Sequence, residues 1–174
     1  MLTHWNKLIN TDCVVVEIGD YVIYPIYRSG SSSLLESANK ILTNQQITDC
    51  ENIHVLIRNP EDRFRSGLDE YCRQNNLNLK NVWQDVSDGK FIDRHFAPQW
   101  LWLLHLHKYY KGPITLRPFE SINNYCKAHV RADEKHRFVP VLKQFVEIDY
   151  KLLQHMNETI KLENLIRKYK NVLS

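Results

Sequence analysis

Short runs of β-branched and aromatic residues along the chain predict a set of β-strands. Gly19 and Asp20 separate the first two runs and can turn one into the other, which predicts an opening hairpin. A later apolar run enters Arg58-Asn59-Pro60, where Pro60 ends the strand and suits the first turn of a following helix. The predicted strands cover residues 13–18, 21–27, 54–57 and 114–117.

Apolar residues at helical spacing predict the helices between and after these strands. Pro98 suits the first turn of a strongly apolar helix, and Gly112-Pro113 ends that helix. Residues 131–137 are charged and predict a linker. The predicted helices cover residues 32–43, 61–74, 79–86, 98–110, 120–129, 141–155 and 158–172.

The order of strand, helix and strand predicts a parallel crossover and therefore an α/β fold. Sheets of this kind bind ligands beyond the carboxyl ends of their strands, and both Arg28 and Arg58 lie at such ends. The chain has 174 residues, of which 43% are hydrophobic. This is enough for a hydrophobic core, so we expect a single domain over residues 1–174.

Net charge narrows the classes of binding partner, and cysteine spacing indicates the redox state of the thiols. A formal charge of +3 is too small to argue for nucleic acid, but it suits anionic ligands. No apolar run approaches the length of a membrane span and residues 1–7 lack a secretory core, so we expect a cytoplasmic protein with no membrane or nucleic-acid partner. The cysteines form no Cys-x-x-Cys pair, which predicts reduced thiols at Cys13, Cys50, Cys72 and Cys126.

A phosphate site is predicted after the second strand, where the chain passes through a small polar turn into helix-forming residues. Backbone N–H groups and the positive end of the helix dipole attract anions at such a position. Arg28 adds a guanidinium that can fork onto phosphate oxygens. A plain helix N-cap is the alternative interpretation. The residues predicted to hold the anion are Arg28, Ser29, Gly30, Ser31, Ser32 and Ser33.

The order of cation, hydroxyl residue, Gly and two further hydroxyl residues resembles the 5′-phosphosulfate loop of sulfotransferases that use 3′-phosphoadenosine 5′-phosphosulfate (PAPS). That family usually has Lys where this chain has Arg28. The resemblance implies that Arg28 stabilises the leaving phosphate. A Walker A loop would need Gly-Lys-Ser/Thr at its end, and this loop has no Lys.

A second motif, running from Arg58 to Ser66, resembles the 3′-phosphate-binding motif of the same family. In that family an Arg at a strand end and a Ser on the following helix clamp the ribose phosphate, so the resemblance implies this role for Arg58 and Ser66 and a structural role for Arg63. An Arg-rich helix with a solvated face is the alternative. Two phosphate motifs in the correct order, about thirty residues apart, favour the resemblance.

Residues 93–99 resemble the Asp/His/aromatic/Pro-Gln segment of Golgi-type and bacterial carbohydrate sulfotransferases, and residues 116–120 and 148–153 resemble their late strand and closing helix. The resemblance implies a P-loop-like three-layer fold with a small central parallel sheet flanked by helices and a helical C-terminus. It also implies sulfuryl transfer from PAPS to a hydroxyl acceptor, a carbohydrate, with 3′-phosphoadenosine 5′-phosphate (PAP) as product and no metal.

The chain is short for this family. We therefore expect residues 75–94 or a second subunit of a homo-oligomer to complete the acceptor groove, and residues 131–138 to contribute to adenine binding.

His95 is the candidate general base, since the pKa of an imidazole lies near neutrality and Asp93 is close enough in sequence to orient it. A structural histidine that caps the helix or binds cofactor is one alternative. Glu36 is another, because some family members use a carboxylate base near this position. A P-loop-type phosphotransferase and a non-catalytic nucleotide- or polyanion-binding domain are the competing functional classes.

Overall fold

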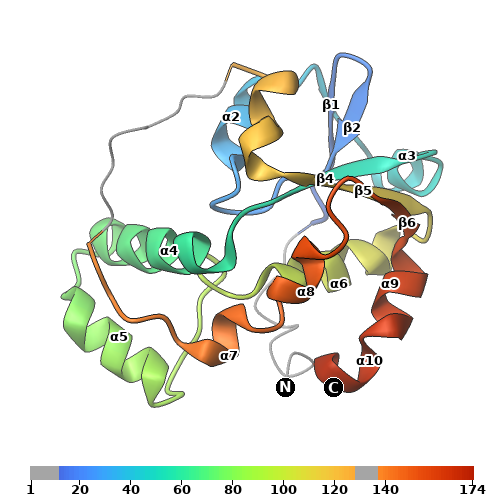
Figure 1. The fold of residues 1–174 in the computed structure, drawn as a ribbon. Helices are drawn as coiled ribbons and strands as arrows, with labels where there is room; N and C mark the ends of the chain where they lie inside the picture. The colour runs from blue at the N-terminus through green and yellow to red at the C-terminus, as the bar shows by residue number, and fades with distance from the viewer. Residues whose placement is uncertain (1–11, 128–136) are drawn as a thin grey trace.

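The computed structural model of the chain describes residues 12–127 and 137–174 and has an α/β fold (Figure 1). Its centre is a six-stranded mixed sheet with the strand order β3-β1-β2-β4-β5-β6. The strands are β1 (Val16–Ile18), β2 (Tyr21–Ile23), β3 (Lys40–Ile41), β4 (Ile53–Ile57), β5 (Pro113–Pro118) and β6 (Thr159–Lys161).

The three central strands of the sheet, β2, β4 and β5, run parallel. Ile23 of β2 is opposite His54 of β4, and the pairing of β4 with β5 starts at Ile53 and Ile114. The outer strands β1, β3 and β6 are antiparallel to their neighbours, and β1 with β2 forms the predicted hairpin. Both strands are shorter than predicted, because β1 starts at Val16 and β2 ends at Ile23, so the predicted strand over 21–27 is wrong after residue 23. The chain therefore leaves β2, β4 and β5 at one edge of the sheet, as the crossover pattern predicts.

Helices cover both faces of the sheet and extend beyond it. Figure 1 shows α2 on one side of the sheet and α6, α8 and α9 on the other, with α4, α5 and α7 grouped beside them. The α-helices are α2 (Ser31–Glu36), α3 (Asn44–Thr48), α4 (Pro60–Gln74), α5 (Leu79–Ser87), α6 (Gln99–Tyr109), α7 (Lys143–Val146), α8 (Tyr150–Leu153), α9 (Leu162–Lys168) and α10 (Lys170–Leu173), and Phe119–Asn124 forms the 3₁₀-helix η1.

Three apolar clusters form the core. The largest contains the buried side chains of α6 together with Val55 and Ile57 of β4 and Leu116 of β5. A second lies among α4, α5 and α7, and a third joins α2 and η1 to the opposite face of the sheet, where Leu56 points. None of the helices in the described ranges is long and apolar enough to cross a bilayer. All four cysteines are free thiols.

The predicted helix over residues 32–43 is wrong in its second half. Helix α2 ends at Glu36, and the chain then forms β3, which pairs with β1 through Lys40 opposite Glu17. A capping box of Thr43 and Gln46 next starts the short helix α3. Pairing with an existing strand edge outweighed helical spacing here, and spacing alone does not contain that information.

The C-terminal predictions also need correction. The helix predicted over 141–155 is two short helices, α7 and α8, and the buried Asp149 lies between them. The helix predicted over 158–172 begins as strand β6, in which Thr159 pairs with Thr115. Of the helix predicted over 120–129, residues 119–124 form η1, and 128–129 lie outside the described residues, as do 131–136 of the predicted linker.

The predictions for the middle of the chain are confirmed. Strands β4 and β5 and helices α4, α5 and α6 lie where the pattern places them, and Pro60 stands in the first turn of α4.

Helix α4 carries a close contact that its sequence does not reveal. A methyl group on Gly67 would collide with the backbone carbonyl of His95, so the missing side chain lets residues 93–97 lie against the helix.

We predict that Gly67→Ala lowers the free energy of unfolding by about 2–3 kcal/mol, because the added methyl group has no space and the backbone at His95 must move. Urea unfolding followed by circular dichroism measures this change. Asn81→Ala on the exposed face of α5 is the control and should change stability by less than about 0.5 kcal/mol. Equal stability of the two variants would contradict the close contact.

Candidate functional site

The loop after β2 has a tightly constrained backbone. The N–H of Ser29 donates to the carbonyl of Ile26 at 3.0 Å and closes a turn in which Arg28 has a φ of +64° and Gly30 a φ of +81°. A side chain on Gly30 would also collide with Ile122 of η1. The predicted phosphate loop is therefore held between the sheet and η1, and an arginine occupies a left-handed conformation that costs a non-glycine residue energy.

The side chain of Arg28 joins the two predicted phosphate motifs directly. Its Nε and Nη2 donate to Oγ of Ser66 at 3.0 and 2.7 Å, and its Nη1 lies 3.6 Å from Oε2 of Glu70. Ser66 is buried in α4. The residue predicted to stabilise a leaving 5′-phosphate and the serine predicted to bind a 3′-phosphate are thus in direct contact in the structure.

Arg58 lies at the end of β4, next to Arg28. Its Nη1 donates to the backbone carbonyl of Arg28 at 3.1 Å, and its guanidinium lies over the ring of Phe119, 5.2 Å from the ring centroid. Burial and the nearby charge of Arg28 lower the pKa of Arg58, and the carboxylates of Asp62 and Glu120 oppose this effect. The lowered pKa reports two like charges held together in partly desolvated surroundings.

Arg63 lies underneath this cluster and is buried. It donates to the carbonyls of Tyr27 at 3.0 Å and Arg94 at 3.5 Å, and also to that of Ala97. Burial lowers the pKa of its guanidinium to about 10, while the charge of Asp149 acts in the opposite direction. Arg63 therefore ties the loop after β2 to residues 94–97, which agrees with the structural role implied by the family resemblance.

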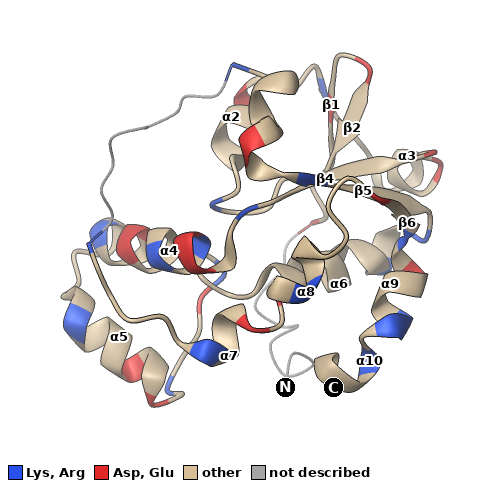
Figure 2. Ribbon diagram, in the orientation of Figure 1, with Lys and Arg blue, Asp and Glu red and all other residues tan. Residues whose placement is uncertain are grey.

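Arg28, Arg58 and Arg63 are close enough that each of the first two lowers the pKa of the third. They form a positive centre on the sheet edge, although acidic and basic residues otherwise alternate along α4 (Figure 2). Convergent guanidiniums in partly buried surroundings favour an anion.

Gln99 and Asp149 are the main residues of the site to which the sequence analysis gave no role. Gln99, the first residue of α6, accepts from the Oγ of Ser29 at 3.3 Å and from the N–H of Arg58 at 3.0 Å. Asp149 accepts from the N–H groups of Gln99 and Trp100 at 2.7 and 3.1 Å. The available signals were a polar residue opening a helix whose next five residues are all apolar, and a carboxylate between Ile148 and Tyr150.

His95 forms the contact with Asp93 that the sequence predicts. Nδ1 of His95 lies 2.5 Å from Oδ1 of Asp93, and the same oxygen accepts the backbone N–H of His95 at 2.9 Å. Burial alone would raise the pKa of Asp93, but the hydrogen bonds and charge of His95 outweigh it, so that this pKa is lowered. The rings of Tyr27 and Tyr71 lie beside the imidazole, with centroids 5.6 and 6.3 Å away.

The serines of the predicted phosphate loop differ in exposure. Ser29 and Ser33 are buried, Ser31 is half-buried and Ser32 is exposed. The hydroxyl of Ser29 points into the protein and donates a hydrogen bond to Gln99, so it supports the loop from its buried side. Glu36, the alternative base, is the exposed last residue of α2.

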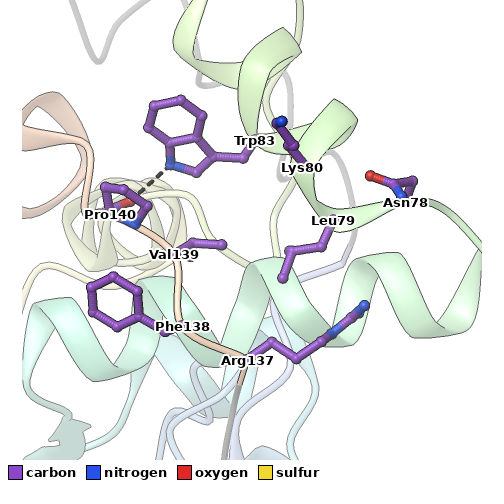
Figure 3. Close-up of a pocket in the computed structure, with 8 residues that line it drawn as sticks. All are labelled: Asn78, Leu79, Lys80, Trp83, Arg137, Phe138, Val139 and Pro140. Atoms are coloured by element: carbon purple, nitrogen blue, oxygen red, sulfur yellow. Dashed lines mark hydrogen bonds between the residues drawn. The ribbon is translucent and has the colours of Figure 1, made fainter.

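A separate groove of about 560 Å³ lies between α5 and residues 137–140 (Figure 3). Leu79, Trp83 and Phe138 line it, and the indole N–H of Trp83 donates to the carbonyl of Pro140 at 2.8 Å. Its lining residues belong to the stretches expected to complete the acceptor groove (75–94) and to contribute to adenine binding (131–138), and to residues 139–140, but none belongs to the two phosphate motifs. Residues 131–136 of the predicted adenine-binding stretch lie outside the described residues, while Phe138 is 79% exposed at the groove.

Within the described ranges, no three metal-ligating side chains cluster.

We predict a pH-dependent contribution of Asp149 to stability. Burial raises the pKa of this carboxyl from 3.8 to about 6, although Arg63 and the N–H donors of Gln99 and Trp100 act against the shift. Between pH 4 and 6 the folded chain thus keeps a proton that the unfolded chain has lost. The stabilisation is complete below the unfolded pKa and is lost as the pH rises through the folded pKa, by about 3 kcal/mol in total.

The comparison with Asp149→Asn tests this sign. The free energy of unfolding of the natural chain, relative to the variant, should be about 2–3 kcal/mol larger at pH 4 than at pH 7.5, so that the natural chain is relatively more stable at the lower pH. Urea unfolding at the two pH values measures it. A difference between the two proteins that does not change with pH would contradict the raised pKa.

Comparison of the chain with models of protein families, with curated proteins and with solved structures found no match in any of the three.

Proposed function

We propose that the protein is a PAPS-dependent sulfotransferase with a P-loop-like three-layer fold, which transfers a sulfuryl group to a hydroxyl of a carbohydrate. The observation that carries the proposal is the meeting of Arg28, in the turn after β2, with Arg58, at the end of the adjacent parallel strand β4, with 3.1 Å between Nη1 of Arg58 and the carbonyl oxygen of Arg28. One nucleotide can reach both residues. A histidine held by a carboxylate, His95 with Asp93, lies beside the same loop.

The charge balance of the cluster supports a ligand with more than one phosphate. Burial and the nearby charge of Arg28 both lower the pKa of Arg58, so the two guanidiniums repel each other in partly buried surroundings, although Glu70, 3.6 Å from Arg28, offsets part of the charge. Phosphate oxygens would relieve this repulsion and accept the forked N–H groups of the guanidiniums. Nε and Nη2 of Arg28, which now donate to Ser66, point in parallel and suit a bidentate contact with one phosphate.

The proposed reaction requires little covalent work from the protein. The acceptor oxygen attacks the sulfur of PAPS, the bond between sulfur and the bridging oxygen of the 5′-phosphate breaks, and PAP leaves with the electron pair. Arg28 and the backbone N–H groups of the loop after β2 neutralise the charge that develops on the leaving 5′-phosphate, while Arg58 and Ser66 hold the 3′-phosphate. The acceptor's hydroxyl proton passes to the base.

His95 is the proposed base because its Nδ1 is held by Asp93, so that Nε2 takes the proton. The carboxylate of Asp93 fixes the orientation of the ring and stabilises the imidazolium that forms. The half-buried rings of Tyr27 and Tyr71 beside His95 offer apolar surface for the acceptor.

We predict that Arg58→Ala weakens the binding of PAP by about 10- to 100-fold, the loss expected for one charge-assisted contact. Arg65→Ala is a matched control. Arg65 is also partly buried, lies over an aromatic ring, Phe138, and donates to one backbone carbonyl, that of Val139. Calorimetric titration with PAP measures both variants.

Titration with ATP in the same experiment separates the competing functions. The sulfotransferase should prefer PAP, whereas a P-loop-type phosphotransferase should prefer ATP with Mg²⁺. An Arg58→Ala variant that binds PAP as tightly as Arg65→Ala would argue against the proposed site.

We predict that His95→Ala lowers the rate of sulfuryl transfer by at least about 100-fold while PAP binding changes little, because the imidazole acts on the acceptor proton. Asp93→Asn should cause a smaller loss. Transfer of labelled sulfate from PAPS to a panel of carbohydrates measures the rates. Glu36→Gln is the control for the alternative base and should keep the natural rate. PAP binding without transfer in the natural chain would indicate a non-catalytic nucleotide-binding domain.

A further inference from the structure

The side chain of Gln99 contacts both loops that carry the predicted phosphate ligands. Its Oε1 accepts from the Oγ of Ser29 in the loop after β2 and from the N–H of Arg58 in the loop after β4, at 3.3 and 3.0 Å. Its Nε2 donates to the carbonyl of Arg58, also at 3.0 Å. One fully buried amide therefore pairs with both backbone polar groups of Arg58 and with the serine next to Arg28.

The position of Gln99 is itself fixed from below. Asp149 accepts the backbone N–H of Gln99 at 2.7 Å and its Nε2 at 3.4 Å. Pro98 provides no side-chain cap for α6, so the carboxylate of Asp149, fifty residues away in sequence, satisfies the first N–H groups of the helix. The indole N–H of Trp100 donates to the carbonyl of Ile148 at 2.9 Å and anchors the same two segments.

We propose that Gln99 is a positioning residue that sets the separation of the two phosphate-binding loops and thereby gives the site its preference for a nucleotide with two separate phosphates. This inference rests on the proposed function. A ligand with phosphates at its 3′ and 5′ positions needs both loops at a fixed distance, whereas a ligand with one phosphate needs only one of them. Loss of the bridge should therefore affect the first ligand more than the second.

The experiment compares the affinities of PAP and of adenosine 5′-phosphate, which lacks the 3′-phosphate. Gln99→Met keeps the length and apolar volume of the side chain but removes every hydrogen bond that the side chain makes, while the backbone N–H of residue 99 still donates to Asp149. We expect the affinity ratio of PAP to adenosine 5′-phosphate to fall by roughly 10-fold or more. Thr115→Val is the control, because this buried hydroxyl on β5 bonds Asn52 and Thr159, away from the loops, and its removal should leave the ratio unchanged.

A second measurement separates the failure of this inference from the failure of the proposed function. If the natural chain binds PAP and Gln99→Met keeps the natural ratio, the positioning role is overturned while the proposed function stands. If the natural chain does not bind PAP, the proposed function fails, and hydrogen exchange at the Arg58 amide still tests the bridge. Exchange at least roughly 10-fold faster in Gln99→Met supports the bridge, and unchanged exchange overturns it.

Gln99→Asn serves if the methionine variant does not fold. Its shorter amide can reach one loop but not both, so we expect the same fall in the ratio with less loss of stability. If Gln99→Asn kept the same ratio of PAP affinity to adenosine 5′-phosphate affinity as the natural chain, the proposal would be overturned.

Discussion

The hydrogen bonds between Asp149 and the start of α6 support the architecture of the whole site. The carboxylate accepts two backbone N–H groups that would otherwise be buried without partners, and it holds Gln99 against the loops after β2 and β4. A buried polar network of this kind is stable only when nearly every member is satisfied, because the low dielectric constant strengthens each bond and penalises each missing one. Four segments far apart in sequence thus depend on one carboxyl group.

A second constraint is the positive charge beneath the site. Arg63 is fully buried, and burying an ion is costly unless hydrogen bonds and an opposite charge compensate. Three backbone carbonyls and the field of Asp149 provide that compensation, although the lowered pKa of Arg63 shows that it is incomplete. Arg28 and Arg58 add further positive charge above it. The protein therefore maintains a cluster of like charges whose repulsion an anionic ligand would relieve.

The backbone around this cluster is equally specialised. Arg28 adopts a positive φ in the loop after β2, and Ile122 of η1 packs closely against Gly30 of the same loop. Gly67 lets residues 93–97 approach α4. These close approaches bring His95, Ser66 and Arg28 to one corner of the sheet. Strained and tightly packed backbone is expected where geometry serves binding or catalysis rather than stability.

Local pattern in the sequence determined the central strands, the opening hairpin, helices α4 to α6 and the position of Arg58 at the end of β4, whereas Arg28 lies in a turn five residues beyond the end of β2. It also indicated the pairing of His95 with Asp93, because these residues are only two positions apart. The tertiary structure decided the rest: the strands β3 and β6, the break at Asp149, the bridge of Gln99 and the contact of Arg28 with Ser66. Those features join residues that are 20 to 70 positions apart, as in the 38-residue separation of Arg28 and Ser66. Periodicity records which face of a segment is buried, but not which distant partner covers it.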